Sequence, residues 1–374
     1  MVDEGGHRMT PRIAIACPGV GLVQRGFERL FRDLFDEMRG EFAMTLFKGG
    51  GERLSDEIIL PFLSRGGRAI GWMPIHRLMG RTPMHAECLT FAIAMLPHLI
   101  GGRYDIVHVI DPPLARLLFH LRRMLGLRFR LLYTEGTAMP PRDYPPCDLL
   151  HQISAATLAD AVAHGHDPAH MALLPCGYRS GRFIASADRA TLRARHGIAP
   201  DRFVLLSVAA LNRGHKRTHH LIDEVAQIEG DPLLWLDGSL DHGDPDLPSY
   251  ARARLGDRVR VTHVASDEVA DLFALADVMP HAATFEAFGL AIVEAAAAGL
   301  PVVLHDAPHF RWLMPNPDCW IDMTAPGALT AQLARMASDP AERARRVMRD
   351  HARTTFDWAA LRPAYADLYR SMMS

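Results

Sequence analysis

Short apolar segments recur along the 374-residue chain, each separated from the next by a turn or by a stretch of helix length. The first, Arg12–Cys17, is followed by a glycine-rich loop and by apolar residues with helical spacing. This order of strand, loop, helix and strand predicts a parallel α/β sheet with right-handed crossovers. The segments that we expect to form strands are 12–17, 43–47, 104–110, 129–134, 149–153, 171–175, 203–209, 233–237, 259–264, 277–280 and 301–304.

The series of strands is interrupted once, between Pro175 and Phe183, by a segment rich in helix and strand breakers. A chain of this length also exceeds what one core usually supports. We therefore expect two α/β domains, 1–178 and 179–355, followed by a C-terminal segment, 356–374. Parallel sheets bind ligands beyond the carboxyl ends of their strands, so the natural site is a cleft between the two.

Composition and charge exclude several classes of protein. Apolar residues make up 49% of the chain and charged residues 22%, which excludes a mainly disordered chain. The halves on either side of residue 180 hold 20 basic and 18 acidic groups, then 21 and 25, so we expect no nucleic-acid binding. Five cysteines without a CxxC pair, and a polar N-terminal segment unlike a signal peptide, predict a reduced, cytoplasmic protein. No uncharged run reaches the length of a membrane span, the nearest being 89–100.

Only two of the 41 basic residues are lysines, Lys48 and Lys216. Lys48 ends a strand where an NAD enzyme would place an acid, and the loop at Gly19 and Gly21 lacks the strict dinucleotide-binding spacing. Both features argue against an NAD-binding site. NADP binding stays open, because a basic residue at this position could suit its 2′-phosphate. We favour a simpler interpretation, in which Lys48 is a solvated strand end.

The most informative segment is 284–304. Strong helix formers occupy 290–298, and Gly299 and Pro301 end the helix. Phe288 and Gly289 then lie at the helix N-terminus, where unpaired N–H groups favour a phosphate. Glu286 precedes the helix and could accept hydrogen bonds from a polyol, and Glu294 would need a partner among its alanines. The alternative is that Glu286 caps the helix and Glu294 is solvated.

The whole pattern resembles the retaining glycosyltransferases of family 4. Two glutamates separated by seven residues, Glu286 and Glu294, match the hallmark of that family, as do the segments 288–290 and 299–303. Further resemblances lie at 26–29, 104–108, 174–183, 272–277, 356–358 and 365–369. The resemblance implies an α/β fold of GT-B type, with two Rossmann-like domains whose parallel sheets face each other across a cleft. It also implies a final helix that crosses back onto the N-terminal domain.

The resemblance also implies roles for individual residues. Glu286 would contact the transferred sugar, the backbone of Phe288, Gly289 and Leu290 would hold sugar and diphosphate, and Glu294 would bind the ribose. Lys216 would bind the diphosphate, with Arg217 as a solvated neighbour. Leu211 stands where relatives have a second cation, so Arg213 is the nearest substitute. We expect the backbone near Val264 to contact the base, and the loop at Gly19, Gly21 and Gly26 to lie beside acceptor and donor phosphate.

The acceptor side departs from the family pattern. Glu135 replaces a histidine found in many relatives and could orient or deprotonate an acceptor hydroxyl. The alternative is that Glu135 caps the turn that follows it. Asp111 is a second candidate at the same end of the sheet, while His108 is expected to be a packed strand residue. Histidines such as His215 and His219, or those at 164–170, lack further ligands at zinc spacing, so we expect no metal.

The resemblance implies a retaining glycosyltransferase that moves a sugar to an acceptor hydroxyl and requires neither metal nor cofactor. Its donor would be a nucleotide-diphosphate sugar of UDP or GDP type. Its acceptor would be a saccharide, a lipid-linked molecule or a small molecule. A sugar-nucleotide 2-epimerase of the same architecture and a non-catalytic nucleotide-sugar-binding scaffold remain as alternatives. The segment 60–84 mixes arginines with large apolar residues and could contact a membrane surface, although a helix and loop packed on the first sheet is the simpler interpretation. The sequence does not indicate an oligomeric state.

Overall fold

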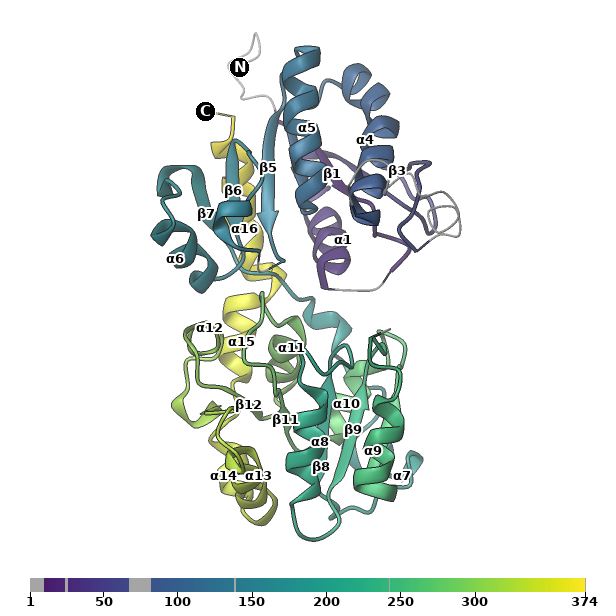
Figure 1. Ribbon diagram of the computed structural model, residues 1–374, viewed down its shortest axis with the longest axis vertical. Coiled ribbons are helices and arrows are strands. Elements are labelled where there is room, and N and C mark those ends of the chain that lie inside the picture. Colours follow the sequence, from purple (N-terminus) through teal and green to yellow (C-terminus); the bar gives the residue numbers. More distant parts are fainter. Residues whose placement is uncertain (1–9, 24–25, 67–81, 138, 242, 374) are drawn as a thin grey trace. The chain divides into compact units, whose positions relative to one another are not determined.

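A computed structural model describes residues 10–23, 26–66, 82–137, 139–241 and 243–373 (Figure 1). Two compact units emerge from the contacts within the chain. Unit 1 contains residues 1–177 together with 358–374, and unit 2 contains residues 178–357. The sequence places its boundary between residues 178 and 179. The segment with Trp72, Met73, Ile75, Leu78 and Met79, for which a membrane contact was an alternative, lies outside the described residues.

Unit 1 is built on one parallel sheet of seven strands, in the order β3-β2-β1-β4-β5-β6-β7. Its strands are β1 (Arg12–Cys17), β2 (Ala43–Lys48), β3 (Glu57–Ile59), β4 (Ile106–Val109), β5 (Arg130–Glu135), β6 (Leu149–Gln152) and β7 (Met171–Leu173). Its helices are α1 (Gly26–Met38), α4 (Pro83–Gly102), α5 (Pro112–Leu125), α6 (Ala155–Ala163) and α16 (Trp358–Ser371). The strand order reverses between β1 and β4, as in a dinucleotide-binding fold.

Unit 2 repeats this plan. It has two three-stranded parallel sheets, β10-β9-β8 and β11-β12-β13. Backbone hydrogen bonds join the two sheets: the Leu206 N–H donates to the Val278 carbonyl, and the Asp277 N–H donates to the Val204 carbonyl. The strands are β8 (Val204–Val208), β9 (Leu233–Asp237), β10 (Val259–Thr262), β11 (Met279–Pro280), β12 (Val302–His305) and β13 (Trp320–Ile321). The helices are α7 (Arg189–Arg195), α8 (Thr218–Ala226), α9 (Leu247–Leu255), α10 (Val269–Leu275), α11 (Leu290–Ala298), α12 (Pro308–Leu313), α13 (Ala328–Ser338), α14 (Pro340–Ala344) and α15 (Arg349–Phe356). The order again reverses at one point, between β8 and β11.

Helix α4 differs from what the sequence predicts. It is long and apolar enough to cross a membrane by length and composition, with about a third of its apolar window buried. A search for uncharged runs misses it because Glu87 lies within it. Glu87 is buried, accepts a hydrogen bond from the Arg65 backbone N–H and forms an ion pair with the Arg65 guanidinium. Phe91 and Met95 of the same helix belong to the core of unit 1. One such helix is weak evidence for a span, because a helix packed in a core meets the same criteria.

Lys48 is a second difference. It is only 4% exposed, and its ammonium pairs with Glu57 and donates to the Glu52 carbonyl. The prediction of a solvated strand end is therefore wrong. Burial alone would raise the pKa of Glu57, but hydrogen bonds from Lys48 and Arg32 outweigh it and lower that pKa. The ion pair between Lys48 and Glu57 thus links the end of β2 to β3.

Helix α16 belongs to unit 1 (Figure 1). A buried chain of hydrogen bonds links it to strands β4, β5 and β6 of the sheet. His151 Nε2 lies 2.9 Å from the Leu174 carbonyl, which can only accept, so this nitrogen carries the proton. The Thr134 hydroxyl then donates to His151 Nδ1 at 2.8 Å and accepts from His108 Nε2 at 2.6 Å. Tyr369 in α16 completes the chain by donating to His108 Nδ1 at 2.9 Å. Burial favours the neutral form of both histidines, for which this assignment of donors and acceptors satisfies every group in the chain of hydrogen bonds. The contacts confirm that His108 is a packed strand residue.

These hydrogen bonds between buried histidines predict that unit 1 is less stable in weak acid than at neutral pH. Burial lowers the pKa of His151 to about 4 and that of His108 well below its usual 6.5. Below pH 6.5 the unfolded chain therefore binds protons that the folded chain does not, so stability falls as pH falls toward 4. Each histidine contributes about 1.4 kcal/mol per pH unit.

The measurement is urea-induced unfolding at several pH values between 6.5 and 5. We expect His151→Gln to reduce the pH slope by about 1.4 kcal/mol per unit. His164→Gln, at an exposed histidine of the same unit, should leave the slope unchanged. Equal slopes for the wild type and His151→Gln would contradict the prediction.

Candidate functional site

The site in unit 2 lies where its strand order reverses. The loop after β8 carries Lys216, and the loop after β11 carries Glu286. Both loops follow the carboxyl ends of parallel strands on either side of the reversal, which is where ligands bind in folds of this kind. The topology therefore brings together two residues that are 70 positions apart in the chain.

The loop with Lys216 is shaped by Asn212. The Asn212 side-chain oxygen accepts from the Lys216 N–H at 2.8 Å, and its carbonyl accepts from the Thr218 N–H at 2.9 Å. The sequence offers no pattern that singles out Asn212. Arg217 adopts a left-handed backbone conformation (φ 51°) and donates to the carbonyls of Ala282 and Met323. The prediction that Arg217 is solvated is therefore wrong, because its side chain ties this loop to the neighbouring strands.

Glu286 is the centre of the site, and its side chain is 6% exposed. Its Oε1 accepts from the Lys216 ammonium and, at 2.7 Å, from His281 Nε2. His215 Nε2 lies 3.7 Å from the other oxygen and donates to the Phe285 carbonyl. Burial alone would raise the pKa of Glu286, but His281 and Lys216 hold it well below its usual range. The carboxylate is ionised and is not a helix cap.

The N-terminus of α11 lies next to Glu286. Gly289 occupies the N-cap position in a left-handed conformation (φ 95°), which glycine adopts without strain. His309, which is buried, donates through Nε2 to the Phe288 carbonyl at 2.8 Å and so fixes the turn that leads into the helix. The predicted bounds of this helix are confirmed, and Leu290 begins it. Its first N–H groups and its dipole are suited to an anion.

Three further residues were predicted to bind the donor. Glu294 is 4% exposed inside α11, so the alternative of a solvated glutamate is wrong. Arg213 pairs with Asp244 and Asp246, at 3.1 and 2.7 Å, and packs over Tyr250. Val264 donates its N–H to Asp237, so this amide is occupied in the structure. The donor roles of these residues stay predictions.

The predicted residues of unit 1 lie at the corresponding end of its sheet. Gly19 and Gly21 follow β1, Gly26 begins α1, and Asp111 follows β4 on the other side of the strand reversal. A Cβ atom at Gly19 would lie 2.3 Å from Glu28 Oε1, and one at Gly21 would lie 2.0 Å from the Gly50 carbonyl. Close packing against backbone therefore requires glycine at position 21, whereas the neighbour of Gly19 is a flexible side chain. Nothing in the structure tests a phosphate role for these glycines.

Glu135 is fully buried at the end of β5. Its carboxylate accepts from Tyr133 Oη at 2.6 Å and from the N–H and hydroxyl of Thr137 at 2.6 and 2.8 Å. The structure thus favours the alternative in which Glu135 caps the turn after its strand. A catalytic role for Glu135 or Asp111 stays a prediction.

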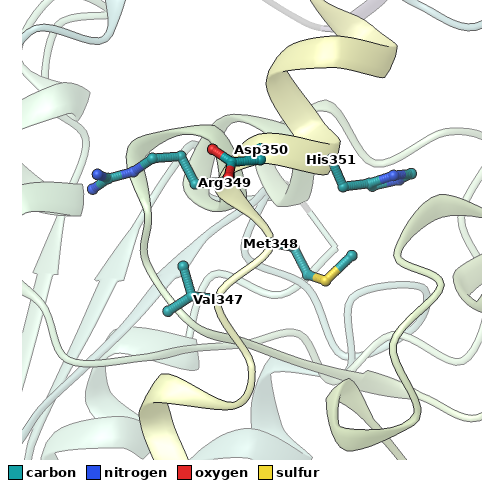
Figure 2. A pocket seen from close by; sticks show the side chains of 5 residues that line it. All are labelled: Val347, Met348, Arg349, Asp350 and His351. Carbon is teal, nitrogen blue, oxygen red and sulfur yellow. The ribbon is translucent and has the colours of Figure 1, made fainter.

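The structure also has a pocket away from these residues. It has a volume of about 340 Å³ and is lined by Val347, Met348, Arg349, Asp350 and His351, where α15 begins (Figure 2). Figure 2 shows Arg349 and His351 extending in opposite directions, and each donates to a backbone carbonyl, of Ala298 and Leu313. Their polar groups therefore do not converge on a ligand. No group of three or more potential metal ligands occurs among the residues that the structure describes.

Comparison with known proteins places this geometry in context. Residues 188–355 match the family described as "Glycosyl transferases group 1". D-inositol 3-phosphate glycosyltransferase of Streptomyces bingchenggensis is 28% identical over 233 residues, which is 56% of this chain and 50% of that protein. The matches span 38%, 50% and 53% of the lengths of three curated relatives.

Solved structures resemble the chain over nearly its full length. Sucrose-phosphate synthase from Thermosynechococcus elongatus superposes with a TM-score of 0.79 at 20% identity, over 97% of this chain and 99% of that one. Anabaena HepE in complex with UDP-glucose gives 0.72 at 18% identity, over 96% and 100%. These similarities confirm the predicted α/β fold of GT-B type with two Rossmann-like domains. Lys216, Glu286 and α11 all lie within residues 188–355, the segment that matches this family.

Proposed function

We propose that the protein is a retaining glycosyltransferase that moves a sugar from a nucleotide-diphosphate sugar to an acceptor hydroxyl. The observation that carries the proposal is the contact of the Glu286 carboxylate with the Lys216 ammonium beside the N-terminus of α11, at the strand reversal of the segment that matches the group 1 family. This arrangement combines a carboxylate for sugar hydroxyls with a cation and a helix N-terminus for phosphate. Such a combination suits a sugar bonded to a diphosphate.

The chemistry follows from where charge develops. As the bond between the sugar and the diphosphate breaks, the leaving group gains negative charge and the sugar gains positive charge. Lys216 and the first N–H groups of α11 would stabilise the diphosphate, and Glu286 would lie against the sugar. We propose departure and attack on the same face, with the diphosphate taking the acceptor proton. Phe288, Gly289 and Leu290 would hold the donor through their backbone, and Glu294 would bind the ribose.

The donor is proposed to be of UDP or GDP type. The similarity to HepE, which binds UDP-glucose, supports a uridine nucleotide. The acceptor is proposed to bind in unit 1, near the loop of Gly19 and Gly21. Sucrose-phosphate synthase and D-inositol 3-phosphate glycosyltransferase are named for small phosphorylated molecules, which supports a small acceptor over a polymer.

The test is calorimetry of nucleoside diphosphate binding. We first screen UDP, GDP and ADP by thermal shift, and then titrate the best ligand into Lys216→Ala and Glu294→Ala. Each variant should weaken binding by about 1.5–3 kcal/mol, or roughly ten- to a hundredfold, because each loses hydrogen bonds that involve a charge.

The controls for this test are Lys216→Arg and Glu229→Ala. Arginine keeps the charge but not the compact ammonium, so an intermediate affinity is expected. Glu229 is an exposed glutamate of the same unit, and its replacement should leave the affinity unchanged. Wild-type affinity in both Lys216→Ala and Glu294→Ala would remove the site assignment.

A further inference from the structure

Lys216 and His281 share one oxygen of Glu286, but the two donors differ in how firmly they are held. The Lys216 side chain is 19% exposed and extends from a loop, whereas the side chains of His281 and Glu286 are 4% and 6% exposed. The His281 N–H donates to the Val303 carbonyl at 2.9 Å, which fixes this residue at the end of the sheet. Its ring packs against Phe310 of α12, with 6.2 Å between the ring centroids. His281 is therefore anchored, while Lys216 is the accessible member.

A diphosphate that enters this site competes with Glu286 for the Lys216 ammonium. The diphosphate carries more negative charge than one carboxylate, and it meets the accessible end of the ion pair. Once Lys216 turns toward the diphosphate, Glu286 is left buried with less positive charge around it. A buried carboxylate without a partner is costly and would take up a proton or change its position.

We propose that His281 is a positioning residue that holds the Glu286 carboxylate in place when the diphosphate draws Lys216 away. This inference rests on the proposed function, because it assigns the exchange to donor binding. In the unliganded protein Lys216 and His281 both hold Glu286, and in the donor complex His281 holds it and leaves the carboxylate directed at the sugar. His281 itself touches neither the sugar nor the diphosphate.

The chain offers a direct way to observe the exchange, because Lys48 and Lys216 are its only lysines. Labelling with lysine that carries ¹³C at the ε position gives two side-chain signals by nuclear magnetic resonance. Lys48 is buried with Glu57 in unit 1 and serves as an internal reference. Addition of UDP, GDP or ADP should shift the Lys216 signal and leave that of Lys48 in place.

The test of His281 compares His281→Met with His281→Gln. Methionine removes the donor, whereas the glutamine amide places an N–H close to the position of Nε2. We expect His281→Met to lower kcat for release of UDP from UDP-glucose, or of GDP from GDP-mannose, by about ten- to a hundredfold. The Kd for free UDP or GDP should stay within about twofold of the wild-type value. His281→Gln should recover most of kcat, and His196→Gln, at an exposed histidine of the same unit, should match the wild type. Equal impairment of the methionine and glutamine variants would overturn the proposal.

A titration without nucleotide separates this inference from the proposed function. The charged and titratable groups that face Glu286 are Lys216 and His215 from the loop after β8, His281 after β11, and His309 from α12. Loss of His281 should move the protonation of Glu286, seen through the Lys216 signal between pH 7 and 3.5, to higher pH. Identical curves for His281→Met and the wild type would overturn the role of His281. If no diphosphate moves the wild-type Lys216 signal, the proposed function fails, while the titration still decides whether His281 holds Glu286.

Discussion

Replacing Glu286 with glutamine is expected to lower the rate of sugar transfer by about 10²- to 10³-fold, the range found when one preorganised electrostatic group is removed from an active site. Glutamine keeps the shape of the side chain but loses the negative charge that would face the sugar as it becomes positive. Diphosphate binding should survive, because Lys216 loses its carboxylate partner and becomes fully available to phosphate. The expected signature is thus a collapse of kcat with an equal or lower Kd for the diphosphate.

The measurement pairs steady-state release of diphosphate with calorimetry on the same preparation. Glu229→Gln, at an exposed glutamate of unit 2, is the matched control and should equal the wild type in both assays. A Glu286→Gln variant that kept its kcat would show that the carboxylate has no part in the chemistry. A variant that lost diphosphate affinity along with kcat would instead indicate that Glu286 organises the phosphate site.

The second large effect concerns stability. Trp358 begins α16, is 2% exposed, and packs against Tyr365 with 5.2 Å between ring centroids. Its indole also lies over Gly177, where a Cβ atom would come within 2.4 Å of Cε2. Replacing Trp358 with alanine should cost about 3–5 kcal/mol of the free energy of unfolding, the usual range for a buried tryptophan.

Urea-induced unfolding, followed by circular dichroism, measures this loss. Trp358→Phe should cost less, because it keeps an aromatic ring in the same place. Gly177→Ala should also destabilise unit 1, since the new methyl group would force the indole to move. A loss below 1 kcal/mol for Trp358→Ala would mean that the tryptophan does not fasten α16.

Much of the fold could be predicted from the sequence because its elements are marked by strong local signals. Helix formers fill Leu290–Ala298, and a glycine and a proline follow, so both ends of α11 agree with the prediction. The strands that were missed, β3 and β13, have only three and two residues and show no periodicity. The error over Lys48 has the same cause, because its partner Glu57 lies on β3.

The site was predictable in its members but not in its contacts. Lys216 and Glu286 stand out through motif and rarity, yet their ion pair joins two loops that only the sheet brings together. His281 is one of 20 histidines, and its spacing does not distinguish it. The available signal was its position immediately after the predicted strand 277–280, at the carboxyl end of a parallel sheet, where ligands bind. For Glu135 the sequence identified the residue but could not show that its carboxylate already accepts hydrogen bonds from Tyr133 and Thr137.

Unit 1 is made of two segments that lie far apart in the chain, and this has a consequence for how the protein is made. Unit 2 is a single stretch, 178–357, that is available to fold as soon as it leaves the ribosome. Most of unit 1 is synthesised first, but α16 is synthesised last. The hydrogen bond between His108 and Tyr369 therefore cannot form until all of unit 2 has been synthesised. The unit synthesised first is therefore the last to be completed, and until then His108, His151 and Phe42 lack the aromatic side chains of α16 that pack against them.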